Sequence, residues 1–317
     1  MRSYQPGLAT VHANGGPALA VWADGFVLPL AEAARRCGVT AAPPASLRAA
    51  LSDWDRWCGV VRQVTADGRP GENGPADGGW QDETEVTFLP SVTDPPTVYC
   101  AAANYHDHLR EMRGEGAQAG QSPMYFVAAP ASLGGHRQGV VRPAGCARLD
   151  WEVELAVIIG RDAEDVAAAD ADRVIAGYSV ANDVSLRDFA RREDYPFFPD
   201  WLRSKSYAGC LPLGPVVVPA SLVPDPMDLA LSLTVNGVQR QASSSKNMIF
   251  SIAEQIEYLS HIVALRPGDI ILTGTPAGTG AAWGSYLSPG DVMVAEIECL
   301  GRLETEVRAI AEAEKGE

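Results

Sequence analysis

Two glutamates separated by one residue, Glu152 and Glu154, are the first side chains whose spacing indicates chemistry. They lie in segment 150–160, whose β-branched and apolar residues end at a glycine and predict a β-strand. Because side chains alternate between the two faces of a strand, both carboxylates would point the same way and repel each other. A hard cation bound by oxygen ligands would compensate this repulsion. The alternative is the solvated outer face of an edge strand.

His108 and Glu111 form a second candidate pair, within a segment that predicts a short helix over 104–113. Residues three apart on a helix can touch. A carboxylate beside an imidazole fixes its tautomer and raises its basicity, which is what a general base requires. A surface helix with two histidines and scattered charges is the alternative explanation.

Two more charged residues gain meaning only from their neighbours. Asp183 follows a predicted strand over 174–180, and Lys205 precedes a valine-rich strand, although most lone lysines are solvated. Two segments could border a pocket: 114–122, which is small and flexible, and 193–201, which is aromatic and contains prolines. An ordinary loop is the alternative for each.

A glycine-rich segment, 274–280, follows a predicted strand over 270–273. It lacks the Gly-Lys-Ser/Thr sequence of a phosphate-binding loop. We expect instead a turn that offers backbone amides and the Thr275 hydroxyl to a carboxylate.

The candidate site residues depend on the rest of the fold for their positions. The first part of the chain contains none of them. Residues 8–29 alternate short apolar runs with glycine turns, which predicts a small antiparallel β unit. Two predicted helices follow, over 30–37 and 45–63, and the Gly- and Pro-rich composition of 67–79 is typical of a linker. We therefore expect a small N-terminal α/β module over residues 1–90 and a main domain over residues 91–317.

Local signals also punctuate the main domain. Ser185 is expected to cap a helix over 186–192. The dipeptide Asn236-Gly237 predicts a hairpin turn, and the capping box at 251–254 predicts the start of an amphipathic helix. Two final strands are expected at about 292–299 and 303–307.

Composition excludes several classes of protein. The chain has 317 residues, of which 46% are hydrophobic and 21% charged, and its net charge is −15. Such an acidic globular chain is a poor nucleic-acid binder, and it shows no apolar run long enough for a signal peptide or a membrane span. Its six cysteines are irregularly spaced, so we expect reduced thiols in a cytoplasmic protein.

These elements, in this order, resemble the fumarylacetoacetate hydrolase family. The similarity covers roughly residue 97 to the end of the chain. The matching motifs are Asn104-Tyr105 with His108 and Glu111; Glu152 and Glu154 running to Gly160; Gly177-Tyr178 with Ala181-Asn182-Asp183; Arg187-Asp188; Lys205-Ser206; Pro212 with Gly214-Pro215; and Leu265 to Asp269 followed by Thr273 to Gly278.

The resemblance implies an α+β, β-rich fold: a mixed β-sandwich roll with short helices, assembled as a homodimer. It implies that Glu152, Glu154 and Asp183 bind Mg²⁺ or Mn²⁺, and that His108 with Glu111 activates water. The remaining site residues that we expect are Lys205, which is catalytic, and Arg187, Tyr195 and Thr275, which contact substrate. The chain departs from the family pattern at Ala190 and at Ala208-Gly209-Cys210, which lie near the substrate in other members.

The function that this resemblance implies is hydrolysis of a C–C bond in a 2,4-diketo acid, such as an acylpyruvate, through a metal-stabilised enolate, with a role in aromatic catabolism. The partner would be a small keto acid rather than a nucleic acid or a membrane. An isomerase or decarboxylase of hydroxy-dienedioate or oxaloacetate-like acids is the first alternative, because it uses the same enolate. A non-catalytic keto-acid binding protein is the second.

Overall fold

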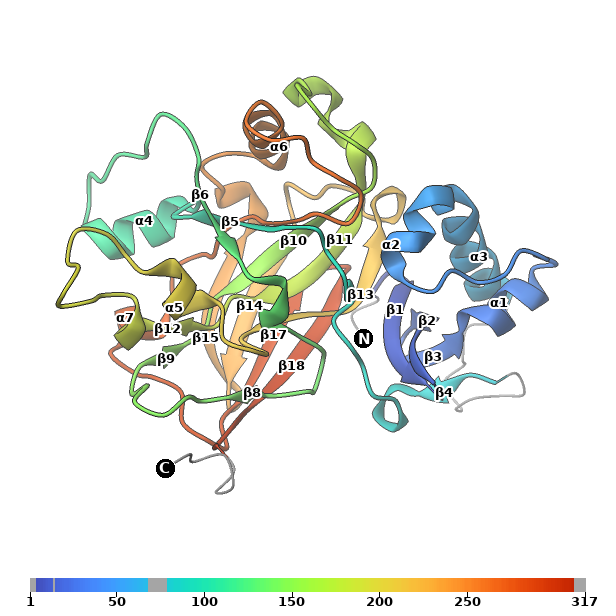
Figure 1. Ribbon diagram of the computed structural model, residues 1–317, viewed down its shortest axis with the longest axis horizontal. Helices are drawn as coiled ribbons and strands as arrows, with labels where there is room; N and C mark the ends of the chain where they lie inside the picture. Colours follow the sequence, from blue (N-terminus) through green and yellow to red (C-terminus); the bar gives the residue numbers. More distant parts are fainter. Residues whose placement is uncertain (1–3, 14, 68–78, 311–317) are drawn as a thin grey trace.

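The computed structural model describes residues 4–13, 15–67 and 79–310. It contains a large mixed sheet, a second sheet packed against it and short helices, as the α+β, β-rich prediction requires (Figure 1). None of the helices in the described ranges combines enough length and apolar character to cross a membrane.

The large sheet has the strand order β4-β3-β2-β1-β13-β11-β10-β16-β5-β6, with β7 beside β13. Its strands are β1 (Gly7–Ala13), β2 (Gly16–Ala23), β3 (Phe26–Pro29), β4 (Gln81–Asp82), β5 (Val98–Ala102), β6 (Met124–Ala128), β7 (Leu133–Gly134), β10 (Val153–Ile159), β11 (Ile175–Asn182), β13 (Leu211–Pro219) and β16 (Ile270–Leu272). The site described below lies where β10 begins and β11 ends.

The second sheet has the order β15-β14-β17-β18-β8, and a short ladder joins β12 to β9. These strands are β8 (Val140–Val141), β9 (Leu149–Asp150), β12 (Ser185–Leu186), β14 (Ala230–Val235), β15 (Val238–Ser244), β17 (Val292–Ile297) and β18 (Gly301–Arg308). The helices are α1 (Leu30–Arg36), α2 (Leu47–Ala50), α3 (Trp54–Asp67), α4 (His106–Arg113), α5 (Trp201–Lys205), α6 (Ile252–Ser260) and α7 (Gly280–Trp283).

Strand β10 lies between β11 and β16 and is buried on both faces. Leu155 and Val157 belong to the core that the large sheet shares with β14 and β17, whereas Ala156 and Ile158 belong to the opposite core. Because faces alternate along a strand, Glu154 continues the face of Ala156. The edge-strand alternative is therefore wrong: the acidic side chains enter from an interior strand.

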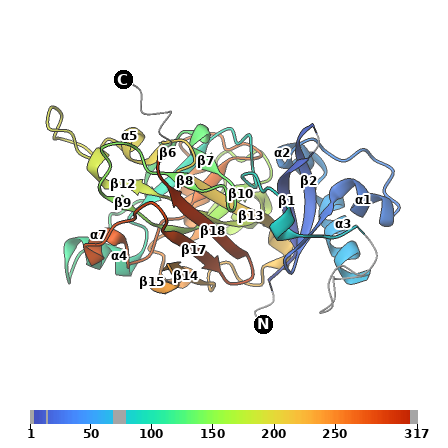
Figure 2. The same cartoon turned by 90° about the horizontal axis from the view of Figure 1, so that it is seen from below.

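The N-terminal strands β1–β3 extend the large sheet, since β1 pairs with β13 at Leu8 and Val217. In Figures 1 and 2 these strands and α1–α3 lie at one end of the molecule, and α4, α5 and α7 lie at the other. The division near residue 90 stays a prediction. Most of its expected linker, residues 68–78, lies outside the described residues.

Local signals were reliable where no distant partner competed. The Asn236-Gly237 turn joins β14 to β15, and the capping box at Ser251 opens α6. The helix expected over 186–192 is wrong. Ser185 lies in β12, opposite Asp150 of β9, and only a 3₁₀ turn follows, over Arg187–Phe189. A ladder with a distant strand replaces the local cap.

Candidate metal centre

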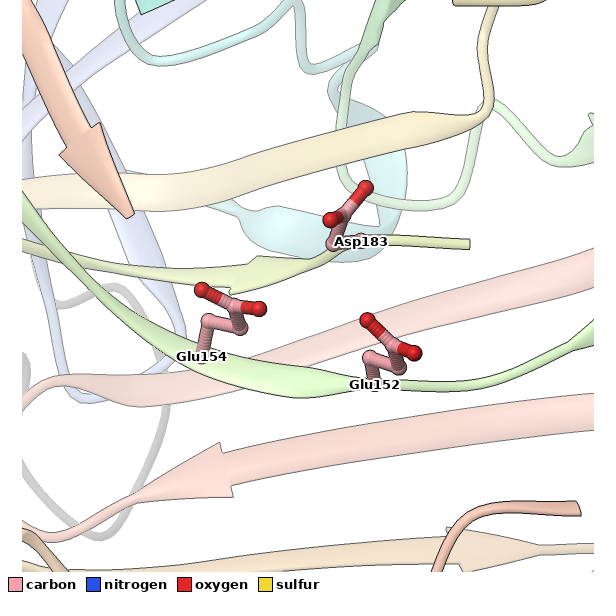
Figure 3. Close-up of side chains that lie close together, drawn as sticks. All are labelled: Glu152, Glu154 and Asp183. Carbon is pink, nitrogen blue, oxygen red and sulfur yellow. The ribbon is translucent and has the colours of Figure 1, made fainter. Parts of the chain in front are cut away.

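Three carboxylates converge where β10 and β11 meet. Each of Glu152, Glu154 and Asp183 offers an oxygen that lies within 4.8 Å of the others, and all three side chains are buried. The Asp183 amide donates to the Glu152 carbonyl at 2.9 Å, which sets Asp183 opposite the start of β10. Figure 3 shows the two glutamates on one face of their strand, with Asp183 across from them. The sequence-predicted metal ligands are therefore brought together.

Two cations and a fourth carboxylate complete this polar centre. Lys205 donates to Glu152 at 2.6 Å and to Asp183 at 2.7 Å, and its side chain is buried rather than solvated. Arg187 bonds to Asp150 at 2.8 Å and also to Glu152. We call the four carboxylates the acidic cluster: Asp150, Glu152, Glu154 and Asp183. Four carboxylates face two cations, so one divalent ion would balance the charge.

The pKa values of the cluster show where positive charge is lacking. Burial raises the pKa of Glu154 well above its usual value, and Asp183 and Glu152 raise it further. Burial also raises the pKa of Asp183, to about 6, despite the opposing effect of Lys205. Burial has the same tendency at Glu152, but Lys205 and Arg187 outweigh it and lower that pKa to about 2. A further cation beside Glu154 and Asp183 would therefore favour their ionised forms.

An unpaired atom supports the same conclusion. The Oδ1 atom of Asp183 is buried and has no hydrogen-bond partner among the described residues, whereas its Oδ2 accepts from Lys205. A buried carboxylate oxygen without a partner is costly unless something binds it. Oxygen-only carboxylate ligands suit a hard ion such as Mg²⁺ or Mn²⁺. The residues present therefore fit a divalent metal.

The predicted base pair forms on α4. His108 Nδ1 lies 3.0 Å from Glu111 Oε2, and the imidazole is buried. Burial favours a raised pKa at Glu111, but hydrogen bonds from His108 and from the Gly278 amide, at 2.7 Å, lower it below its usual value. An ionised Glu111 accepts from Nδ1–H and leaves Nε2 free to take a proton. The glycine-rich loop joins this pair to the acidic cluster, because its amides donate to Glu111 from Gly278 and to Glu154 from Gly274.

The glycine-rich loop binds carboxylates, as expected, but they belong to the protein itself. The Gly274 amide donates to Glu154 at 2.7 Å and the Gly278 amide to Glu111. Gly278 has a φ of +101°, and a Cβ there would lie 2.1 Å from the Arg240 carbonyl oxygen, so only glycine fits. The loop therefore fixes the acids of the site.

Thr275 is held by the scaffold. Its hydroxyl donates to the Val153 carbonyl at 2.9 Å and accepts from Gln241 at 2.9 Å. The Tyr195 side chain is exposed and packs edge-on against Phe197. Substrate contacts by Arg187, Thr275 and Tyr195 stay predictions.

Sequence reasoning missed Asp150. This fully buried carboxylate accepts from the amides of Gly280 and Ala281 and from Arg187. It stands two residues before Glu152, so the same-face spacing that marks the glutamates also includes it. Gln241 was missed as well. It accepts from the Val153 amide at 2.9 Å and donates to the loop, and no local pattern indicates this role.

Comparison with known proteins agrees with this geometry. The family model described as "Fumarylacetoacetate (FAA) hydrolase C-terminal" matches residues 97–308. An oxaloacetate tautomerase of Rattus norvegicus, described as mitochondrial, is 37% identical over 220 residues, which cover 69% of this chain and 68% of that protein.

Two solved structures have the same fold. The fumarylacetoacetate hydrolase of Exiguobacterium antarcticum superposes with a TM-score of 0.75 at 29% identity, over 96% of this chain and 100% of that one. The maleylpyruvate hydrolase of Sphingobium sp. SYK-6, in complex with manganese(II) and pyruvate, gives a TM-score of 0.72 at 26% identity, over 96% and 100% of the two chains. The manganese in that relative is consistent with a divalent metal at the acidic cluster. The chain therefore belongs to the fumarylacetoacetate hydrolase family of enzymes.

Proposed function

We propose that this protein is a metal-dependent hydrolase that cleaves a C–C bond in a 2,4-diketo acid of the acylpyruvate type. The observation that carries the proposal is the buried His108–Glu111 pair, which the loop that also binds Glu154 holds in place. Because Nδ1 contacts Glu111, Nε2 is the imidazole nitrogen that would act as the base. A reaction that begins with an activated water needs such a base.

Glu152, Glu154 and Asp183 would hold the divalent ion, either Mg²⁺ or Mn²⁺. When bound there, the ion would act as a Lewis acid that stabilises negative charge on the 2-oxygen of the keto acid. Lys205, ion-paired with Glu152 and Asp183, adds positive charge close to the same place. Arg187 keeps Glu152 ionised and fixed by its second ion pair.

His108 carries the proton steps. Its Nε2 takes a proton from a water molecule, and the oxygen of that water forms a bond to the distal carbonyl carbon of the substrate. The bond between that carbon and C3 then breaks, which releases a carboxylic acid and an enolate of the pyruvate type. The enolate regains a proton at C3 from the His108 imidazolium, while Glu111 holds the ring in place and balances its charge.

A second candidate is tautomerisation or isomerisation of an oxaloacetate-like acid, and the 37% identity to an oxaloacetate tautomerase favours it. This reaction needs only a base beside a centre that stabilises an enolate. His108 would then take a proton from C3 while the 2-oxygen gains one, or the reverse, and no water would add to a carbonyl. Decarboxylation of the same acids uses the same enolate.

The deciding experiment is a turnover screen of acylpyruvates and oxaloacetate with Mn²⁺ or Mg²⁺, with and without EDTA. Hydrolysis predicts equimolar release of pyruvate and a carboxylic acid that carries ¹⁸O from labelled water. Loss of the enol absorbance of oxaloacetate without new acid would instead establish the tautomerase. Tight keto-acid binding without any turnover would favour a binding protein.

A further inference from the structure

An aromatic surface begins directly beside the polar centre. Lys205 Nζ, held between Glu152 and Asp183, lies 5.8 Å from the centroid of the Phe126 ring on β6. Phe126 in turn stacks on Trp201, with ring centroids 4.7 Å apart and planes only 6° from parallel. Trp201 is the first residue of the helix that ends at Lys205. Polar and apolar surfaces therefore adjoin on α5.

The segment before α5, which we call the aromatic loop, spans residues 191–199. The residues that flank the loop are joined by a backbone hydrogen bond from the Asp200 amide to the Ala190 carbonyl, at 2.8 Å. Arg192 adds a second link, because it bonds to Asp194 and lies 3.7 Å from Asp200. The two ends of the aromatic loop are therefore held together.

The aromatic loop exposes large apolar side chains to solvent. Tyr195, Phe197 and Phe198 are 56%, 76% and 72% exposed, and Leu202 on the first turn of α5 is 66% exposed. Single exposed apolar residues are common, but a contiguous group of them marks a binding surface. Because exposure of these rings to water is unfavourable, binding of an apolar group that covers them lowers the free energy.

Both ends of this segment are tied to the acidic cluster. Arg187, just before the loop, and Lys205, just after it, bond to the same carboxylate, that of Glu152. In both Figure 1 and Figure 2 the loop lies at the end of the molecule that also carries α4, the helix of His108. A ligand that alters the contacts of Glu152 would therefore act on the two anchors of the loop.

We propose that Phe126, Trp201 and the aromatic loop form a subsite for an apolar, ring-sized distal group of the substrate. The inference rests on the proposed function for the keto-acid end of the substrate, which lies at the acidic cluster. The distal group extends over the Phe126–Trp201 stack, and the aromatic loop covers it. The occupant is assigned as substrate rather than a second protein because the stack is continuous with Lys205 inside the site.

The test compares two acylpyruvates that differ only in the distal group, benzoylpyruvate and acetylpyruvate. The variant is Phe197→Ser with Phe198→Ser, and the matched control is Ile262→Ser, an exposed apolar residue after α6. The ratio of kcat/KM for benzoylpyruvate to that for acetylpyruvate should fall about tenfold in the double variant, mainly through KM, as loss of apolar contacts predicts. Ile262→Ser should leave the ratio unchanged.

A parallel binding experiment separates this inference from the proposed function. Calorimetry of the wild-type protein with Mn²⁺ should show tighter binding of phenylpyruvate than of pyruvate, and the double variant should lose that preference. A preference without turnover of either acylpyruvate would reject the hydrolase while the subsite stands. Equal binding of the two acids by the wild type, an unchanged kcat/KM ratio, or a change of oligomeric state in the double variant would overturn the subsite.

Discussion

In the N-terminal region, residues 4–13 and 15–67, the buried polar side chains are Thr10 and Thr65, and each donates to a backbone carbonyl. Where β10 begins and β11 ends, by contrast, four carboxylates and the lysine at the end of α5 are buried together. Burial of a hydroxyl with a partner costs little, whereas desolvation of a buried charge costs several kcal/mol per ion, which pairing offsets only when its geometry is excellent. The contrast teaches that the first region serves packing, whereas the second buries charges that packing does not require and that the proposed metal chemistry would use.

Replacement of Glu154 by glutamine tests this contrast most severely. The amide oxygen can still accept from Gly274, but one ligand and one negative charge are lost. We expect kcat/KM to fall on the order of 10⁴-fold, since a Lewis acid contributes several kcal/mol. Near pH ~7, the metal-free variant should melt at a higher temperature than the metal-free wild type, because burial raises the pKa of Glu154 and folding must either protonate this group or bury its charge, a cost that a neutral glutamine avoids. A lower melting temperature with intact activity would contradict the comparison.

Replacement of His108 by alanine should separate proton transfer from metal binding. We expect turnover to fall by roughly 10²–10⁴, the usual contribution of general acid–base catalysis. Mn²⁺ affinity, measured by calorimetry, should change little because His108 is not among the proposed ligands. Unchanged cleavage of diketo acids in this variant would show that another group activates the water.

Replacement of Leu28 by alanine probes the N-terminal region. Leu28 lies fully buried on β3, within the core that also contains Ala33 and Val61. The cavity should lower the free energy of unfolding by roughly 2–5 kcal/mol. The kcat of the folded protein should stay within about twofold. Urea titration and turnover assays on one preparation measure both. A large loss of kcat would show that the two regions are coupled.

His136 sharpens the comparison, because it is a buried ionisable group outside the site. Burial, with Arg137 and Arg302 nearby, lowers its pKa to about 3, whereas an unfolded histidine titrates near ~6.5. The unfolded chain therefore binds the extra proton first as the pH falls. The stability contribution is complete above about pH 6.5 and is lost toward about pH 3, by about 1.4 kcal/mol per pH unit.

The variant His136→Gln keeps an acceptor for the Glu304 amide, which His136 Nδ1 binds at 3.1 Å. Urea titrations between about pH 6 and pH 4 should show that the free energy of unfolding falls less steeply with pH in the variant than in the wild type. The difference in slope should correspond to at most one proton. Identical slopes in the two proteins would mean that His136 is already protonated in the folded state.

Part of the site could be predicted because it depends on local geometry. Glu152 and Glu154 share a face through strand alternation, and His108 meets Glu111 through helical spacing. The same alternation includes Asp150, so this residue could have been found.

Other parts of the site lacked any local signal. Ser185 has the residue type of an N-cap, yet it pairs with Asp150 of β9 in a β-ladder. Gln241 and the amides of Gly274 and Gly278 reach the site through loops and strands that only the complete fold brings together.

The sequence by itself determined which side chains could do chemistry and which neighbours share a face, because the periods of strand and helix follow from backbone stereochemistry. Only the tertiary structure decided that Lys205 lies between Glu152 and Asp183 and that one Asp183 oxygen has no partner in the described part of the chain. Contacts between residues far apart in the chain depend on strand register and on the packing of two sheets, and no short stretch of sequence contains that information.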